Sequence, residues 1–356
     1  LVVLDGLFHA GNVGTQLRVN GVDVPDPYAV RMSGGTGTNN WRTALSGTGA
    51  GAAWNGDVVR AGAALTQFYA TTDSGTEFTV AGDISDEPGT TAALLLRGGG
   101  TGRLTGAIDL GANALSKTDG STWIVDTDTV IAGSVNVNNG TLSIGDGGTR
   151  GVLPAGAPVT ILDDADRLTI ARSDSYDVAN ALGGAGNFRQ DGTGTTTLSG
   201  VNTNFSGDFE LYSGTLAVDS LDDIGSGEFF WEPGAGGDGT LRIEGGLVIP
   251  NAMTFNAKSI NVPHVVNASG DNTMAGPLTF PGGGADYIFE SQSGTLTFLG
   301  NAVPQVGDKE LIFQGAGDIV YDGVLGVSSR ADFLTKKGAG TLTLSATNQF
   351  TGRTRI

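Results

Sequence analysis

The chain has 356 residues, of which 60 are glycine and none is cysteine, and its 37 Asp and Glu outnumber its 19 Lys and Arg, giving a net charge of −18. The negative charge disfavours binding to nucleic acid, the absence of cysteine excludes disulfides and thiolate metal sites, and no apolar run is long enough to cross a membrane as a helix. Abundant Thr, Val, Asp, Asn and Gly are typical of short strands joined by turns, so the composition predicts an all-β chain.

Strands and glycine turns are predicted along the first half of the chain. Leu1–Leu4 is an apolar run that we interpret as a strand already under way, and because no initiator Met or export signal precedes it, we interpret the sequence as a processed piece or an excerpt. Gly34–Gly37 and Gly183–Asn187 are predicted to be plain turns. Asp57–Ala70 has loose helical spacing, so a helix is an alternative there, and a single helical turn is an alternative at Asp177–Leu182.

Two short patterns recur along the chain. The first is an apolar residue, any residue, glycine, any residue and a second apolar residue, as in Trp54–Val58, Leu104–Ile108 and Phe205–Phe209. The second is the tripeptide Gly-Thr-Leu, usually followed by alternating apolar residues. Its copies begin at Gly140, Gly214, Gly239, Gly294 and Gly340. Alternation of this kind after a glycine predicts a short strand that follows a turn and buries one face.

Longer copies indicate a repeating unit. Lys117–Val125, Gln190–Ser199, Glu290–Phe298 and Lys336–Ser345 align with one another. Their matching threonines are Thr122, Thr195, Thr295 and Thr341, whose separations of 73, 100 and 46 residues are close to multiples of about 24. Three short strands and three turns make a unit of this length, which is one coil of a parallel β-solenoid. We therefore predict that the four threonines occupy the same corner of their coils, and that the chain makes about 15 coils.

The solenoid interpretation also predicts which side chains form the core. They are the apolar residues that alternate after the glycine turns, namely Leu142, Ile144, Leu296, Phe298, Leu342 and Leu344. The polar residues between them are predicted to face water.

Lys336–Ile356 resembles the autotransporter-associated β-strand repeat of bacterial surface proteins, and Ala181–Val218 resembles it nearly as well. The residues that carry the second resemblance are Gly192, Gly194, Leu198, Ser199, Gly200, Asn202, Phe205, Gly207 and Gly214-Thr215-Leu216. Leu115–Gly145 is similar, with Asp119 and Trp123 as departures. The resemblance is strongest over residues 180–356, and it implies a right-handed parallel β-helix that is exported and displayed on the bacterial surface. We predict one elongated β-helical domain, residues 1–356, that belongs to a longer chain or an assembly.

Few residues are candidates for metal binding. His9 and His264 are the only histidines, and each is predicted to be a surface or packed residue. Asp163, Asp164 and Asp166 form the densest acidic cluster, for which a solvated turn is predicted and calcium binding is the alternative. Asp222–Asp223 is likewise predicted to be a polar loop.

Polysaccharide lyases and glycosidases also use parallel β-helices, so a carbohydrate-active enzyme is the alternative function. A glycosidase needs two carboxylates about 5–10 Å apart, and acids one coil apart on one face meet that distance. Glu210 and Glu232 are 22 residues apart, and Tyr212, Phe230 and Trp231 are candidate platforms for sugar rings. An acid-rich chain often places two acids one coil apart, so we predict no catalytic, cofactor-binding or metal-binding residue.

The predicted function is that of a non-enzymatic extracellular structural protein, a β-helical surface fibre, passenger or filament subunit for adhesion or matrix assembly. A carbohydrate-binding or phage-type fibre module is a further alternative. The expected partners are further copies of the chain, end to end or laterally, and a cell-surface or glycan ligand; nucleic acid binding and membrane insertion of this segment are not expected. Lys336, Lys337, Arg353 and Arg355 form the one local concentration of basic residues, interpreted as surface charge.

Overall fold

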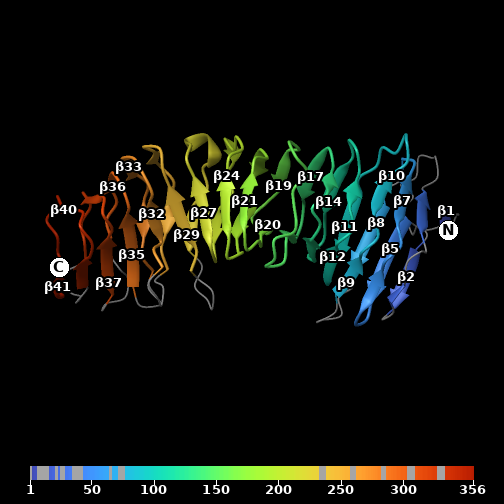
Figure 1. Cartoon of the computed structure of the whole chain (residues 1–356), viewed down its shortest axis with the longest axis horizontal. Helices are drawn as coiled ribbons and strands as arrows, with labels where there is room; N and C mark the ends of the chain where they lie inside the picture. The colour runs from blue at the N-terminus through green and yellow to red at the C-terminus, as the bar shows by residue number, and fades with distance from the viewer. Residues whose placement is uncertain are drawn as a thin grey trace. The chain divides into compact units, whose positions relative to one another are not determined.

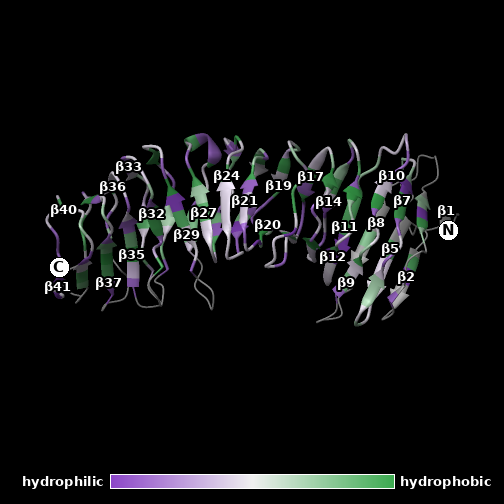
Figure 2. Cartoon of the chain, viewed as in Figure 1, coloured by the Kyte–Doolittle hydropathy of each residue, from purple (hydrophilic) through white to green (hydrophobic). Residues whose placement is uncertain are grey.

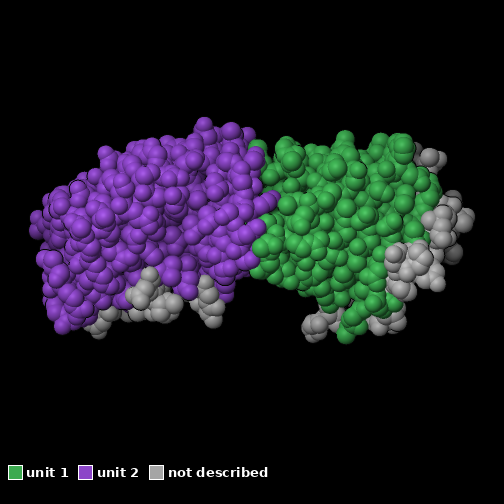
Figure 3. Space-filling model, viewed as in Figure 1, with its two compact units in different colours: residues 1–172, 180–187 green, residues 173–179, 188–356 purple. Residues whose placement is uncertain are grey.

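The computed structural model describes residues 2–5, 16–20, 23–24, 29–33, 43–63, 66–70, 77–231, 238–256, 262–281, 286–302, 309–326 and 333–356. They form two compact units: unit 1 comprises residues 1–172 and 180–187, and unit 2 comprises residues 173–179 and 188–356 (Figure 3). In the described ranges the chain is a parallel β-solenoid with about 12 turns of about 23 residues. The all-β class and the solenoid are confirmed. The estimate of about 15 coils is too high, because some coils contain long connections without strands, such as residues 145–158.

Unit 1 has three parallel sheets, here called faces A, B and C (Figure 1). Face A contains β1 (Val2–Asp5), β4 (Val30–Ser33), β7 (Val58–Ala61), β10 (Ile84–Asp86), β13 (Ile108–Asp109) and β16 (Val130–Ile131). Face B contains β2 (Gln16–Asn20), β5 (Thr43–Thr48), β8 (Thr66–Ala70), β11 (Leu94–Gly98), β14 (Ala114–Lys117), β17 (Ser134–Val137), β19 (Val159–Ile161) and β22 (Leu182–Gly184). Face C contains β3 (Asp23–Val24), β6 (Ala52–Trp54), β9 (Glu77–Val80), β12 (Thr101–Leu104), β15 (Thr122–Val125), β18 (Thr141–Ile144) and β20 (Arg167–Ile170).

Unit 2 also has three parallel sheets, here called faces D, E and F. Face D contains β21 (Ser175–Val178), β24 (Thr195–Leu198), β27 (Thr215–Val218), β29 (Thr240–Ile243), β32 (Val265–Asn267), β35 (Asp286–Ser291), β37 (Glu310–Gln314), β39 (Phe333–Lys336) and β41 (Thr354–Arg355). Face E contains β30 (Val248–Ile249), β33 (Asn272–Met274), β36 (Thr295–Phe298), β38 (Asp318–Tyr321) and β40 (Leu342–Leu344). Face F contains β23 (Asn187–Gln190), β26 (Phe209–Leu211), β28 (Phe229–Trp231), β31 (Met253–Thr254) and β34 (Leu278–Thr279). The short strand β25 (Asn204–Phe205) and the 3₁₀ turn η1 (Leu221–Asp223) lie in the connections.

Pairing between successive coils stacks like side chains into columns. On face A the column Val30, Val58, Ile84, Ile108 and Val130 follows intervals of 28, 26, 24 and 22 residues, and each side chain is at most 7% exposed. Apolar residues alternate with polar ones along the strands (Figure 2), so each strand buries one side. The interior of each unit is therefore a continuous hydrophobic core, which supplies the main driving force for folding.

The predicted core residues occupy inward positions. Leu142, Ile144, Leu296 and Phe298 are at most 1% exposed, whereas Leu342 and Leu344 in the coil 341–356 are half-buried. Unit 2 has the more aromatic core, in which rings from neighbouring coils stack, such as Phe289 on Phe313 at 5.7 Å between centroids.

Three local predictions are wrong. Thr195 begins β24 on face D and Thr295 begins β36 on face E, so the four threonines do not share one corner. Every corner uses the same strand–glycine turn–strand chemistry, and coil lengths vary enough that multiples of 24 do not identify the side. The spacing does hold within face E, where Thr295 pairs with Asp318 and the adjoining pair Ile319–Leu342 places Thr341 next in that column.

The two helix alternatives are also wrong. Asp57–Ala70 contains β7 and β8, and Asp177–Leu182 joins the end of β21 to the start of β22 without a helix. The apparent helical spacing at 57–70 arises because two strands of different faces each contribute buried residues, namely Val58 and Phe68. Pairing with neighbouring coils decides the conformation over intrinsic spacing.

The apolar-x-Gly-x-apolar pattern corresponds to a corner where coils approach closely. A Cβ on Gly82 would lie 1.9 Å from the carbonyl oxygen of Gly56, and a Cβ on Gly106 would lie 2.2 Å from that of Gly82. In unit 2, a Cβ on Gly227 would lie 1.7 Å from the carbonyl oxygen of Gly207. Only glycine fits these columns, which accounts for part of the high glycine content.

Candidate functional site

The corner that follows a Lys or Gln is the first feature the repeats place consistently. Lys117 ends β14 at an inward position, in a column between Leu96 and Val137, and its side chain is fully buried. Its Nζ donates to the carbonyl oxygens of Thr118 (2.9 Å), Asp119 (2.7 Å) and Asn139 (2.8 Å). The ammonium group thus satisfies turn carbonyls that would otherwise be buried without a donor.

The aligned residues of the other copies do the same. Gln190 donates through Nε2 to the carbonyl oxygen of Gly192 at 2.7 Å. Lys336 donates through Nζ to the carbonyl oxygens of Lys337 (2.7 Å) and Gly338 (3.1 Å). The first position of the repeat is therefore a donor that holds the turn between two strands.

The departures Asp119 and Trp123 are compensated locally. Asp119 has a φ of 66°, in the position where the last copy has Gly338 with a φ of 80°. Arg97 donates to both carboxylate oxygens of Asp119, each at 3.1 Å. Burial alone would raise the pKa of Asp119, but the hydrogen bonds from Arg97 and Gly98 and the neighbouring positive charges outweigh it and lower that pKa. Trp123 covers Gly102 of the preceding coil, which leaves room for the indole.

Burial lowers the pKa of Lys117 to about 8, because desolvation outweighs the attraction of Asp119 and Asp166. Between about pH 8 and pH 10.5 the unfolded chain holds this proton and the folded chain does not, so the free energy of unfolding rises with pH by up to about 3 kcal/mol. We expect the Lys117→Met variant to lack this rise in urea unfolding at pH 7.5 and pH 10, while the exposed Lys337→Met keeps it. Equal pH slopes for the wild type and Lys117→Met would contradict the assignment.

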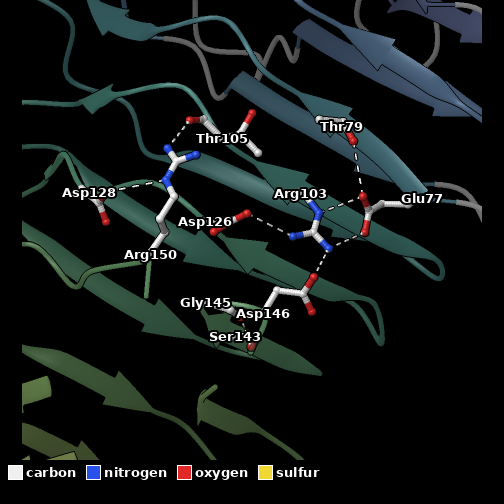
Figure 4. A network of polar contacts seen from close by, with 10 residues as sticks. All are labelled: Glu77, Thr79, Arg103, Thr105, Asp126, Asp128, Ser143, Gly145, Asp146 and Arg150. Atoms are coloured by element: carbon white, nitrogen blue, oxygen red, sulfur yellow. Dashed lines mark hydrogen bonds and ion pairs between the residues drawn. The ribbon is translucent and has the colours of Figure 1, made fainter. Parts of the chain in front are cut away.

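A network of charges lies on the outer side of face C (Figure 4). Arg103 on β12 binds both oxygens of Glu77 on β9, at 2.8 and 3.0 Å. It also binds Asp126 after β15 at 3.2 Å and Asp146 after β18 at 2.6 Å. The hydrogen bond to Glu77 is the largest cause of the raised pKa of Arg103. One guanidinium thereby joins four successive coils, and the sequence pattern did not identify it.

The Arg103→Gln substitution is expected to destabilise unit 1 by about 1–3 kcal/mol, because three carboxylates lose their shared cation. The loss should shrink in about 1 M NaCl, where the remaining repulsion is screened. Arg150→Gln is the matched control, since Arg150 is 50% exposed and meets Asp128 at 3.6 Å only, and we expect less than about 0.5 kcal/mol. Urea unfolding at both salt concentrations measures the effect; similar losses for the two variants would contradict it.

Asp163, Asp164 and Asp166 lie in one turn, but their side chains do not converge. The amide of Asp163 donates to Oδ2 of Asp166 at 3.1 Å, and the amide of Ala165 donates to Oδ1 of Asp163 at 3.2 Å. Asp166 is fully buried, and burial raises its pKa. Within the ranges that the structure describes, no group of three or more His, Asp or Glu side chains is arranged to hold a metal ion. Asp163 and Asp166 close the turn, and calcium binding there gains no support.

Asp222–Asp223 is more than the predicted polar loop. Asp222 is exposed, whereas Asp223 is 5% exposed and accepts from the amide of Ser220 at 2.9 Å, while the Ser220 hydroxyl accepts from the amide of Asp222 at 3.2 Å. These bonds form a capping box for η1. Burial raises the pKa of Asp223.

The acids considered for catalysis do not form an open pair. Glu210 is 5% exposed, and its Oε2 lies 3.7 Å from Nη1 of Arg189, which also stacks on the ring of Tyr212 at 4.2 Å. Glu232 lies outside the described residues. Trp231 is wrong as a sugar platform, because it is 1% exposed and donates from Nε1 to the carbonyl oxygen of Gly239 at 3.0 Å. Tyr212 and Phe230 are half-buried.

His264 is a packed residue, as predicted, and His9 lies outside the described residues. Its ring is fully buried among the aromatic residues of unit 2, 5.7 Å from Phe255 and 5.9 Å from Trp231 between centroids. Nδ1 accepts from the amide of Ile288 at 3.3 Å, so Nε2 carries the proton shared with the carbonyl oxygen of Asn256 at 2.8 Å. Among the residues described here, no helix has the length and apolar character to cross a membrane.

The Passenger-associated-transport-repeat family model matches residues 188–218 and 334–356. The first match runs from β23 through β24 and β26 to β27, and the second from β39 through β40 to β41. Both therefore contain the donor corner described above. The chain contains autotransporter passenger repeats. The predicted resemblance is confirmed at these two copies, and Leu115–Gly145 lies outside the matched residues.

A relative supports the same conclusion. The autotransporter adhesin BmaC of Brucella suis biovar 1 (strain 1330) is 32% identical to the passenger-repeat chain over 115 residues. The match covers 31% of this chain and 3% of the adhesin, so the chain spans a small fraction of the relative's length. No solved structure matches the chain. The β-solenoid and the repeats together make this an autotransporter-type passenger β-helix.

Proposed function

We propose that this chain is a non-enzymatic segment of a bacterial surface protein with an adhesin-like role, located at the cell surface or outside the cell. The observation that carries the proposal is the coincidence of the passenger repeats with structural corners: both matched segments build coils of a parallel solenoid. The relative named as an adhesin supports the role. A solenoid presents long outer faces on which many weak contacts add up to firm attachment.

The adhesive role is tested with the purified chain coupled to beads. We expect the beads to adhere to host cells or to an extracellular-matrix coat more than beads carrying a heat-denatured sample of the same chain. Equal adhesion by both samples would contradict a role that depends on the fold. On intact bacteria that make the parent protein, antibodies against this chain should bind without permeabilisation, and binding only after permeabilisation would contradict the location.

The absence of catalysis is tested separately. Incubation with uronate and neutral polysaccharides is expected to give no new reducing ends and no unsaturated products. Turnover that is abolished by Glu210→Gln would contradict the proposal and favour a carbohydrate-active enzyme, in spite of the contact between Glu210 and Arg189.

We also propose that the chain self-associates through its coils. In residues 341–356 the inward side chains are half-buried or exposed, while the paired residues Ile319 and Tyr321 of the preceding coil are fully buried. A second copy stacked on this edge would bury Leu342, Leu344 and Phe350 and pair their strands. Light scattering is expected to show a mean mass that rises with concentration and falls in Leu344→Asp; a monodisperse monomer at high concentration would contradict it.

A further inference from the structure

The coil at residues 333–356 differs in charge from the rest of the chain. It contains four of the 19 Lys and Arg residues and none of the 37 Asp and Glu residues. Lys337, Arg353 and Arg355 are exposed and make no ion pair with a described carboxylate. Elsewhere arginines are paired, as Arg31 with Glu87 at 2.6 Å and Arg242 with Glu244 at 3.0 Å. The surface charge of this coil is therefore positive and uncompensated.

The register places these cations together on the outer side of face D. Thr335 pairs with Arg355 and Phe313 pairs with Lys336, so Lys337 lies one coil from Arg355 and two positions further along. Arg353 and Arg355 are two residues apart on the outer side of β41, roughly 7 Å along the strand. The guanidinium of Arg353 lies 5.9 Å from the ring of Phe333, which holds it over the strand face.

We propose that this basic patch, formed by Lys337, Arg353 and Arg355, binds an acidic polysaccharide, which names the ligand class of the adhesin-like role and rests on that proposed function. Charge complementarity supports the choice, because repeated carboxylates along a polymer match cations arranged along a strand. The side chain between the two arginines is Thr354, an exposed hydroxyl that suits the hydroxyls of a sugar. The patch is a flat strand face without an apolar helix, which distinguishes it from a membrane-binding surface.

The remaining charge of the chain gives the interaction an unusual salt dependence. At about 0.1 M salt the Debye length is about 10 Å, so a polyanion at the patch is attracted by the local cations and hardly repelled by distant acids. At about 0.01 M the length is about 30 Å, and the net charge of −18 opposes binding. At about 1 M the attraction itself is screened. Binding is therefore strongest at intermediate salt, whereas an ordinary basic protein binds best at the lowest salt.

The test measures binding of the purified chain to immobilised polygalacturonate at about 0.01, 0.1 and 1 M salt. We expect the highest affinity at 0.1 M and a loss of about tenfold there in the Arg353→Gln/Arg355→Gln variant. The Arg150→Gln/Arg242→Gln variant removes the same charge from paired arginines and should change the affinity less than twofold. Far-UV circular dichroism of each variant should match the wild type.

Three results would overturn the proposal: equal binding to uncharged dextran, unchanged affinity of Arg353→Gln/Arg355→Gln, or binding to vesicles of anionic phospholipid but not to polygalacturonate. Adhesion of the wild-type chain to cells from which acidic glycans have been removed would overturn this proposal alone and leave the adhesin-like role in place. Loss of all adhesion by the folded chain would contradict the proposed function itself.

Discussion

Replacement of Gly106 by alanine is expected to destabilise unit 1 by about 3–5 kcal/mol, although it adds a single methyl group. The new Cβ would lie 2.2 Å from the carbonyl oxygen of Gly82 and 2.7 Å from that of Ala81. Both contacts are with backbone, so no side chain can rotate away, and β12 and β13 would have to move apart from the preceding coil. Urea unfolding followed by circular dichroism measures the loss, and hydrogen exchange should rise first in β9–β13.

The matched control is Gly148→Ala. Gly148 belongs to the same unit, its backbone is not left-handed, and a Cβ there would have no neighbour within 4 Å. We expect a change within about 0.5 kcal/mol, or a slight gain because the unfolded chain loses freedom. If Gly106→Ala unfolded at the same urea concentration as this control, close approach of the coils would not be what requires glycine.

The second large effect is expected at an ion pair inside unit 1. Arg60 and Asp86 occupy paired inward positions on β7 and β10, and Nη1 of Arg60 lies 3.3 Å from Oδ1 of Asp86. Arg60 is fully buried, and its guanidinium also donates to the carbonyl oxygen of Ala92. Burial lowers the pKa of Arg60 and raises that of Asp86, in each case against the attraction of the partner.

We expect Asp86→Ala to cost about 3–5 kcal/mol, because it leaves a buried guanidinium without its counter-charge. The double variant Arg60→Met/Asp86→Ala removes both charges and should recover more than half of that loss. Urea unfolding of the wild type, both single variants and the double variant completes the cycle. Additive losses would contradict the pairing and indicate that each side chain acts through packing alone.

The repeats allowed the coil and its corners to be predicted, because Gly-Thr-Leu and the alternating residues after it report turn and burial directly. The side of the coil could not be predicted. Thr195 and Thr295 begin strands of different faces, since each corner uses the same local chemistry. Only pairing between coils distinguishes the faces, and pairing depends on lengths that vary from coil to coil.

The polar residues of the interior were missed for a related reason. Arg60 has the same parity as Val58 on β7, and Asp86 the same parity as Ile84 on β10, so both point inward. That parity is visible in the sequence, but the interval of 26 residues that brings the two together differs from the assumed 24. Lys117, in contrast, was aligned with Lys336 and Gln190 from the start, although its role as a donor to turn carbonyls required the structure.

Constant register on face E has a consequence for how such chains change in length. Thr295 pairs with Asp318, and Thr341 adjoins the next pair, so each step on this side is 23 residues. Duplication or loss of one whole coil in the gene would leave every remaining column in register, because each coil contacts only the coils next to it. A change of one or two residues within a strand would instead turn core side chains outward. Recombination between copies can therefore lengthen or shorten the protein in whole coils without rebuilding its interior.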